Sequence, residues 1–202
     1  MLPVAHEGED RMRTLTYYVA VTLDGYIAAP DGSYDFFPWS QDLTDHISTR
    51  LPETVPTHIR AQLGMGEVPN QRFDTVVMGR GTYQPALDAG ITSPYAHMRQ
   101  YVASTTLKAI DDPAVELVQR DPLALVRTLK KEEGELGIWL AGGGVLAGVL
   151  APEVDELVIK RYPIVIGAGL PAFDGEFAVL PFRLEDTLTF ANGTTLSVYT
   201  RA

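Results

Sequence analysis

Residues 138–150 read IWLAGGGVLAGVL, an apolar run that three consecutive glycines divide in two. The part before the glycines, Ile138–Ala141, is short and rich in large apolar side chains, as expected of a strand buried on both faces of a parallel sheet. The part after them continues as a helical pattern that must stop before Pro152. We therefore predict a strand, a glycine turn and a helix in this order, which is the repeating pattern of an α/β sheet.

The rest of the chain repeats this pattern. Short apolar runs predict further strands at Thr14–Val21, Asp74–Met78, Tyr101–Ser104, Val115–Val118 and Leu157–Ile166, the last with a bend at Pro163. Helical patterns lie between them, from Ser40 to Pro52, in a short segment after Gly81, and over Asp121–Glu133, which Asp121 can cap. Alternating residues on both sides of Asn192-Gly193, over Leu184–Phe190 and Thr195–Tyr199, predict a C-terminal hairpin. The expected fold is an α/β, mostly parallel sheet flanked by helices, with an antiparallel edge.

Length and composition allow one core in 202 residues, of which 46% are hydrophobic. We expect a flexible N-terminal tail over residues 1–12 and a single domain over residues 13–202, with residues 49–72 as an excursion that contains one helical turn at Thr57–Leu63. The net charge of −10 argues against a nucleic-acid-binding surface, and the absence of cysteine excludes disulfides and cysteine-based metal sites. The first eleven residues do not resemble a secretory signal and no apolar run reaches the ~18 residues of a membrane span, so a cytoplasmic protein without membrane contact is expected.

The glycine turn Ala141–Gly144 is the first candidate binding site. Glycines between a strand and a helix let backbone amides approach an anion, and the helix N-terminus adds a positive dipole. A tight packing turn also uses glycines but needs fewer than three, so phosphate binding is the favoured interpretation.

Two further strand ends carry groups that bind anions. Gly79-Arg80-Gly81-Thr82 offers a guanidinium fork and a hydroxyl, although a surface arginine at a helix start is the alternative. Ser104-Thr105-Thr106 offers three hydroxyls, a cluster that is also common in ordinary loops. Because the carboxyl ends of parallel strands meet at one edge of the sheet, we expect the three segments to face one crevice.

The segment after the first strand is a candidate substrate region. Asp24-Gly25 is a turn signal, for which a plain hairpin turn is the alternative. Tyr34, Phe36, Phe37 and Trp39 follow in a loop, where they form either a buried plug or a wall for a flat ligand.

Four segments, in this order, resemble the dihydrofolate-reductase-like family, which includes the reductase domain of riboflavin biosynthesis. They are TLTYYVAVTLDGYIA (14–28), TVVMGRGTY (75–83), YVASTT (101–106) and LAGGGVLAGVL (140–150), and the resemblance covers about residues 13–201. It implies an eight-stranded, mostly parallel sheet with a C-terminal antiparallel hairpin. It also implies NADPH as the cofactor and a pterin, pyrimidine or related heterocycle as the substrate.

The same resemblance implies roles for individual residues. Ala20 and Ile27 would border the nicotinamide. Contacts to the adenosine 2′-phosphate and the pyrophosphate would come from Gly79, Arg80, Gly81, Thr82, Ser104, Thr105 and Thr106, and the pyrophosphate would lie against Ala141, Gly142, Gly143, Gly144, Val145 and Leu146. The resemblance also suggests a cis peptide bond at Gly142-Gly143.

On the substrate side, dihydrofolate reductases keep a carboxylate a few residues beyond a tryptophan. Here Trp39 is followed by Asp42 at a shorter gap, which argues against dihydrofolate itself as the substrate. Asp42 is the candidate catalytic residue, able to orient a heterocycle by accepting two N–H bonds and to assist its protonation. The alternative is an acidic residue that the helix dipole favours in a first turn. Asp24 and Trp39 are candidate substrate contacts, and no metal site is predicted.

The sequence thus predicts an NADPH-dependent reductase of a small conjugated heterocycle that prefers NADPH over NADH. A ligand-binding protein of the same fold without turnover is the alternative, since a fold does not fix a function. A homodimer is compatible with the family and with exposed strand edges.

Overall fold

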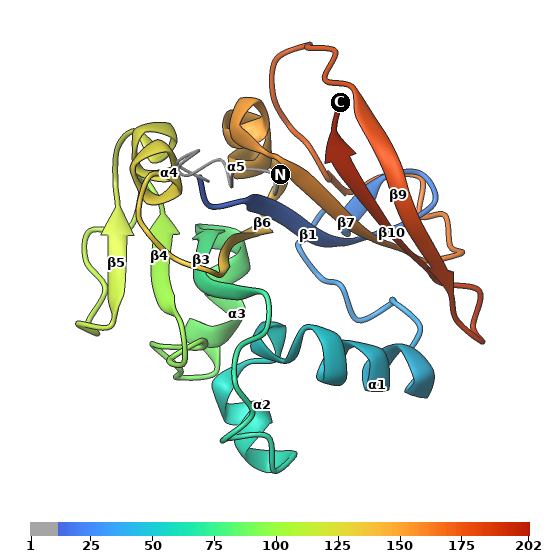
Figure 1. Ribbon diagram of the computed structural model, residues 1–202, viewed down its shortest axis with the longest axis horizontal. Helices are drawn as coiled ribbons and strands as arrows, with labels where there is room; N and C mark the ends of the chain where they lie inside the picture. Colours follow the sequence, from blue (N-terminus) through green and yellow to red (C-terminus); the bar gives the residue numbers. More distant parts are fainter. Residues whose placement is uncertain (1–11) are drawn as a thin grey trace, which may run out of the picture.

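An eight-stranded sheet forms the centre of the molecule (Figure 1). The computed structural model describes residues 12–202, so the predicted N-terminal tail lies outside it except for Met12. The strands are β1 (Leu15–Val21), β3 (Phe73–Gly79), β4 (Arg99–Ala103), β5 (Val115–Val118), β6 (Gly137–Gly142), β7 (Glu156–Arg161), β9 (Phe182–Thr189) and β10 (Thr195–Arg201). They follow the order β5-β4-β3-β6-β1-β7-β10-β9. The strands from β5 to β7 pair in parallel, β10 is antiparallel to β7, and β9 is antiparallel to β10, which confirms the predicted sheet and its hairpin edge.

Helices cover both faces of the sheet (Figure 1). They are α1 (Gln41–Arg50), α2 (Thr57–Gln62), α3 (Arg80–Asp88), α4 (Pro122–Lys130) and α5 (Gly144–Leu150), with 3-10 turns at Pro52–Thr54 and Ala151–Glu153. Successive side chains along β1 point to opposite faces of the sheet. Tyr17 and Val19 join the core cluster under α4 and α5, whereas Tyr18 joins the cluster under α1 and α3.

A small second sheet lies outside these layers. β2 (Tyr26–Ala28) pairs with β8 (Leu170–Pro171), although neither strand was predicted. The turn signal at Asp24-Gly25 is confirmed, since the Thr22 amide donates to the Tyr26 carbonyl at 2.9 Å and the chain reverses there. The long run that begins at Leu157 ends as a strand at Arg161, before Pro163, as the proline requires.

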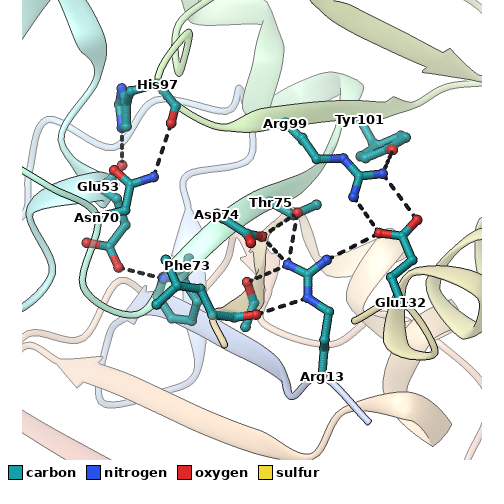
Figure 2. Close-up of polar contacts among 12 residues, drawn as sticks. Arg13, Glu53, Asn70, Phe73, Asp74, Thr75, His97, Arg99, Tyr101 and Glu132 are labelled. Carbon is teal, nitrogen blue, oxygen red and sulfur yellow. Dashed lines mark hydrogen bonds and ion pairs between the residues drawn. The ribbon is translucent and has the colours of Figure 1, made fainter. Parts of the chain in front are cut away.

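The excursion over residues 49–72 is tied to the sheet by a buried carboxylate (Figure 2). Glu53 is fully buried and accepts from the amides of Arg72 and Phe73, both at 2.8 Å. His97 bonds the Glu53 carbonyl through Nε2 at 2.8 Å and the Thr57 hydroxyl through Nδ1 at 2.8 Å. These contacts fix the chain at the start of β3 and hold α2 against the same edge.

A network of ion pairs joins side chains at the amino ends of the strands (Figure 2). Arg13 is 4% exposed, and its guanidinium pairs with Asp74 and Glu132 and donates to the Leu136 carbonyl at 2.9 Å. Arg99, at the start of β4, also pairs with Glu132. Removing one partner of such a buried network would leave an uncompensated charge, so we assign it a structural role. No helix within residues 12–202 has both the length and the apolar character required to span a bilayer.

Candidate functional site

The carboxyl ends of β3, β4, β5 and β6 open onto one groove with a volume of about 520 Å³. Its walls come from the segment that follows each strand. The structure brings together on this groove the sequence-predicted residues Gly79, Arg80, Gly81, Ser104, Thr105, Thr106, Gly143, Gly144, Val145 and Leu146. The expected meeting of three segments at one rim is therefore found in the structure.

Glycine is required where the ends of β3 and β6 meet. A Cβ on Gly79 would lie 3.2 Å from the Gly143 nitrogen and 3.4 Å from the Gly142 oxygen, so any side chain there would push this peptide. The Gly142-Gly143 bond is cis, as the resemblance implies. The Thr82 hydroxyl lies 3.5 Å from the Cβ position of Gly142, and Ile27 Cδ1 lies 3.8 Å from that of Gly143. Thr82 and Ile27 thus adjoin this peptide without lining the groove.

The N-terminus of α5 forms one wall of the groove. Its first amides, Gly144, Val145 and Leu146, have no acceptor inside the helix, because the first intrahelical bond runs from the Ala147 amide to the Gly143 carbonyl at 2.9 Å. The side chain of Val145 is 65% exposed. Together with the helix dipole, these amides favour an anion.

The loop over residues 170–175, which begins with β8, is seated on α5 and also lines the groove. A Cβ on Gly144 would lie 2.1 Å from the Pro171 carbonyl oxygen, and one on Gly148 would lie 2.3 Å from the Asp174 carbonyl oxygen. The Asp174 amide donates to the Gly144 carbonyl at 2.9 Å. Two glycines, four residues apart on one face of the helix, therefore let the loop approach the helix backbone.

Arg80 and the loop after β4 are joined across the groove. Arg80 Nη1 donates to the Thr106 hydroxyl at 2.7 Å, and both side chains are exposed. The buried hydroxyl of Ser104 instead accepts from the amides of Thr106 and Leu107 at 3.2 and 3.0 Å. Ser104 therefore shapes the loop, whereas the side chains of Arg80, Thr105 and Thr106 are exposed where they line the groove.

The sequence interpretation missed the junction between β5 and α4. Gln119, Arg120 and Asp121 line the groove, so its lining contains a second cation, Arg120, in addition to Arg80. Gln119 donates to the Leu107 carbonyl at 3.0 Å, which joins this junction to the loop after β4. This junction could have been predicted to line the groove, because the strand over Val115–Val118 was predicted and its carboxyl end must meet the same edge of the sheet.

Ala20 and Ala141 lie outside the groove lining. Ala20 is the register partner of Lys160 on β7 and, two residues beyond Tyr18, shares the sheet face that α1 covers. Ala141 packs against the core cluster on that same face. Ala20, for which the resemblance implies a nicotinamide contact, thus lies near the end of β1 and outside the groove lining.

Asp24 and the aromatic loop lie around the turn after β1. The Asp24 carboxylate accepts from the amides of Gly167 at 2.8 Å and Ile166 at 3.2 Å, so it ties two loops together. In the aromatic loop over residues 34–39, one ring packs against the protein and another is exposed, as in the two arrangements expected from the sequence. Phe37 packs on Tyr162 with ring centres 4.7 Å apart, whereas Trp39 is 71% exposed.

Asp42 is engaged by the protein. Its Oδ1 accepts from the Ser40 hydroxyl and from the Leu43 amide, and its Oδ2 accepts from the Ala191 amide at 2.8 Å. The bonds from Ser40 and Ala191 hold the pKa of Asp42 below its ordinary value. The carboxylate is therefore ionised at neutral pH, where it can accept a hydrogen bond but holds no proton to donate.

Comparisons with known proteins agree with this geometry. A sequence model of the RibD C-terminal domain matches residues 13–196. The Bacillus subtilis protein YwjB is 30% identical over 192 residues, which cover 94% of this chain and 99% of YwjB. A Shewanella sp. PV-4 protein assigned to riboflavin biosynthesis superposes with a TM-score of 0.70 at 24% identity, covering 95% of this chain and 99% of its own. Dihydrofolate reductase from Enterococcus faecalis, solved with NADP(H), gives a TM-score of 0.62 at 16% identity, covering 93% and 96%. These structural likenesses show the fold.

Proposed function

Because the chain belongs to the RibD C-terminal domain family, we propose that it is an NADPH-dependent reductase of a small conjugated heterocycle. The convergence of Arg80, Thr106 and the first amides of α5 on one groove supports this function most directly. A guanidinium fork, hydroxyls and a helix N-terminus are the donors that phosphate oxygens take in proteins. The residues present therefore fit a dinucleotide with its phosphates in this groove.

Each wall of the groove has a part in this proposal. Arg80 has five N–H donors and uses one of them on Thr106, so the others are available to a 2′-phosphate. The amides of Gly144 to Leu146 would hold the pyrophosphate. Ala20 and Ile27 would then border the nicotinamide, which supplies the hydride when bound.

The chain itself supplies position and exclusion of water. We propose that Trp39 and its neighbours in the loop before α1 cover a flat acceptor, and that Asp24 holds the turn beneath them. Asp42 stays a proposed substrate contact. This role requires its Oδ2, which has a single donor from the protein, to face the substrate.

A titration with NADPH and with NADH tests the cofactor assignment, with the quenching of protein fluorescence as the signal. We expect NADPH to bind at least 10-fold more tightly than NADH. Equal affinities for NADPH and NADH, or no binding of either, would refute the cofactor assignment. If NADPH binds but is not oxidised with any pterin, pyrimidine or quinone of a panel, the chain is a ligand-binding protein of the same fold.

Arg80→Ala makes this test specific to one contact. A hydrogen bond to a charged group contributes about 1.5–3 kcal/mol, so the affinity for NADPH should fall roughly 10- to 150-fold, with a smaller loss for NADH. Arg50→Ala is the matched control, because Arg50 is an exposed arginine in the last turn of α1, outside the groove. An equal loss for both cofactors would mean that Arg80 does not contact the 2′-phosphate.

We also propose a homodimer, formed through the apolar surface beside β9. Phe177 is 95% exposed and Val179 is 78% exposed, beside a largely apolar cavity of about 360 Å³. A monomer rarely leaves such side chains in water, and β9 is an edge strand. Sedimentation velocity should give a dimer for the native chain and a monomer for Phe177→Asp; a native monomer at all concentrations would contradict the proposal.

A further inference from the structure

Lys160 lies beside the position proposed for the nicotinamide. It is the register partner of Ala20 at the carboxyl ends of β7 and β1. Side chains two residues apart share a face of a strand, so Tyr18 and Tyr162 lie on the same face as Ala20 and Lys160. The Nζ atom of Lys160 is 4.7 Å from the centre of the Tyr18 ring. This is the face on which the loop before α1 packs, through Phe37 and Tyr162.

The ammonium group of Lys160 has no counter-ion. Among residues 12–202 no carboxylate pairs with it, and the ionisable side chains around it are the phenols of Tyr18 and Tyr162. Lys130 shows the usual arrangement, since its buried Nζ bonds Asp155 at 2.8 Å. Within residues 12–202, the ammonium group of Lys160 thus has the face of the Tyr18 ring as its contact and no carboxylate as its partner.

The face of the Tyr18 ring gives this ammonium group a cation–π contact, and an oxygen that carries negative charge would add a charge-assisted hydrogen bond. Lys160 is half-buried, and the desolvation of its ammonium group lowers its pKa. Asp42 is the carboxylate that the sequence places on the substrate side, but among residues 12–202 no ion pair joins it to Lys160. A ligand oxygen that carries negative charge would therefore supply the charge-assisted hydrogen bond that Lys160 lacks within these residues.

We propose that Lys160 determines substrate specificity by selecting a planar heterocycle that turns an anionic or strongly polarised oxygen toward its ammonium group. The rings of Phe37 and Tyr162, which are tilted by 44° to each other, give this heterocycle an aromatic wall. A carboxylate in the same place would instead select an amino-substituted ring that carries protons. The inference rests on the proposed function, because Ala20 marks the nicotinamide side.

Calorimetry with three small probes, with and without NADPH, tests this inference. Orotate is a pyrimidinedione with a carboxylate, uracil is the same ring without the charge, and 2,4-diamino-6-methylpyrimidine carries amino groups. We expect the native protein to bind orotate at least 10-fold more tightly than uracil, and the diaminopyrimidine most weakly. No preference for orotate, or a preference for the diaminopyrimidine, would overturn the inference.

Variants assign the preference to Lys160. Lys160→Met keeps the length of the side chain and removes the charge, so the preference for orotate should fall at least 10-fold; Lys160→Arg should retain most of it. Lys131→Met, at an exposed lysine after α4, is the matched control and should bind all probes as the native protein does. Preserved orotate preference in Lys160→Met overturns the inference. A structural role for Lys160 over Tyr18 would lower the melting temperature of Lys160→Met without changing the ratio between orotate and uracil.

The two proposals fail in different ways. NADPH affinity, measured on the same samples, should be equal in the native protein and in the variants at Lys160. Loss of NADPH binding in all samples, including the native protein, refutes the proposed cofactor. Intact NADPH binding with no charge preference refutes only the role of Lys160.

Discussion

Gly144→Ala should destabilise the protein, whereas the same change at Gly81 should stabilise it. A Cβ on Gly144 would lie 2.1 Å from the Pro171 carbonyl oxygen, and ordinary contact begins near 3.4 Å, so the loop over residues 170–175 must move by about 1.3 Å. A Cβ on Gly81 meets no atom within 4 Å. Both glycines lie in the first two residues of a helix, so the gain in helix propensity is common to both.

The expected difference follows from two magnitudes. Overpacking costs about 1–3 kcal/mol, and alanine is favoured over glycine in a helix by about 1 kcal/mol. Because the Cβ of Gly144→Ala would meet a backbone carbonyl, its cost lies at the upper end of the overpacking range. We expect Gly144→Ala to lose about 2 kcal/mol and Gly81→Ala to gain about 0.5–1 kcal/mol of unfolding free energy. A domain of this size shifts by roughly 2–4 °C per kcal/mol, so the two melting temperatures should differ by about 5–12 °C.

Thermal unfolding by calorimetry or circular dichroism measures this difference directly. Melting temperatures within about 2 °C of each other would refute the reasoning, because they would mean that the loop is not seated on α5.

Three further predictions concern residues around the sheet. Glu53→Ala leaves the amides of Arg72 and Phe73 without an acceptor, so chemical denaturation should show a loss of about 2–5 kcal/mol, and a loss below 1 kcal/mol would contradict the bonding described. Burial holds the pKa of His97 below its ordinary value, so the neutral imidazole stabilises the folded state above about pH 6.5, and this contribution is lost as the pH falls below that value. The unfolding free energies measured at pH 7 and at pH 5 should therefore differ less in His97→Gln than in the native protein. Equal differences in the two proteins would contradict this prediction. Asp42→Asn weakens the acceptor for the Ala191 amide; turnover should fall while the affinity for NADPH is unchanged, and unaltered turnover would remove Asp42 from the substrate side.

The sequence was sufficient for the sheet because the strands and glycine turns are local patterns. The run IWLAGGGVLAGVL becomes β6, the cis peptide and α5 with hardly a change of boundary, because each part is set by neighbouring residues. Asp121 was predicted as an N-cap and accepts from the Ala124 amide at 2.9 Å, again within one turn. The hairpin around Asn192-Gly193 was predicted for the same reason.

What the sequence could not predict depends on contacts between distant segments. β2 and β8 are more than 140 residues apart and too short to show any periodicity. The hydrogen bond from the Ala191 amide to Asp42 engages the carboxylate that the sequence analysis proposed for the substrate. This bond forms only because the turn of the C-terminal hairpin lies against α1. Lys160 lies within an apolar run, and only the folded sheet shows that no carboxylate among residues 12–202 pairs with it.

Hydrogen exchange with and without NADPH tests most directly whether the groove holds a dinucleotide. We predict that saturating NADPH slows the exchange of amides in three separate peptides together, those that contain Arg80–Thr82, Thr105–Thr106 and Gly144–Leu146, while the amino ends of the strands around Arg13 are unchanged. Protection in none of these peptides, or in only one of them, would contradict a dinucleotide site built from all three segments.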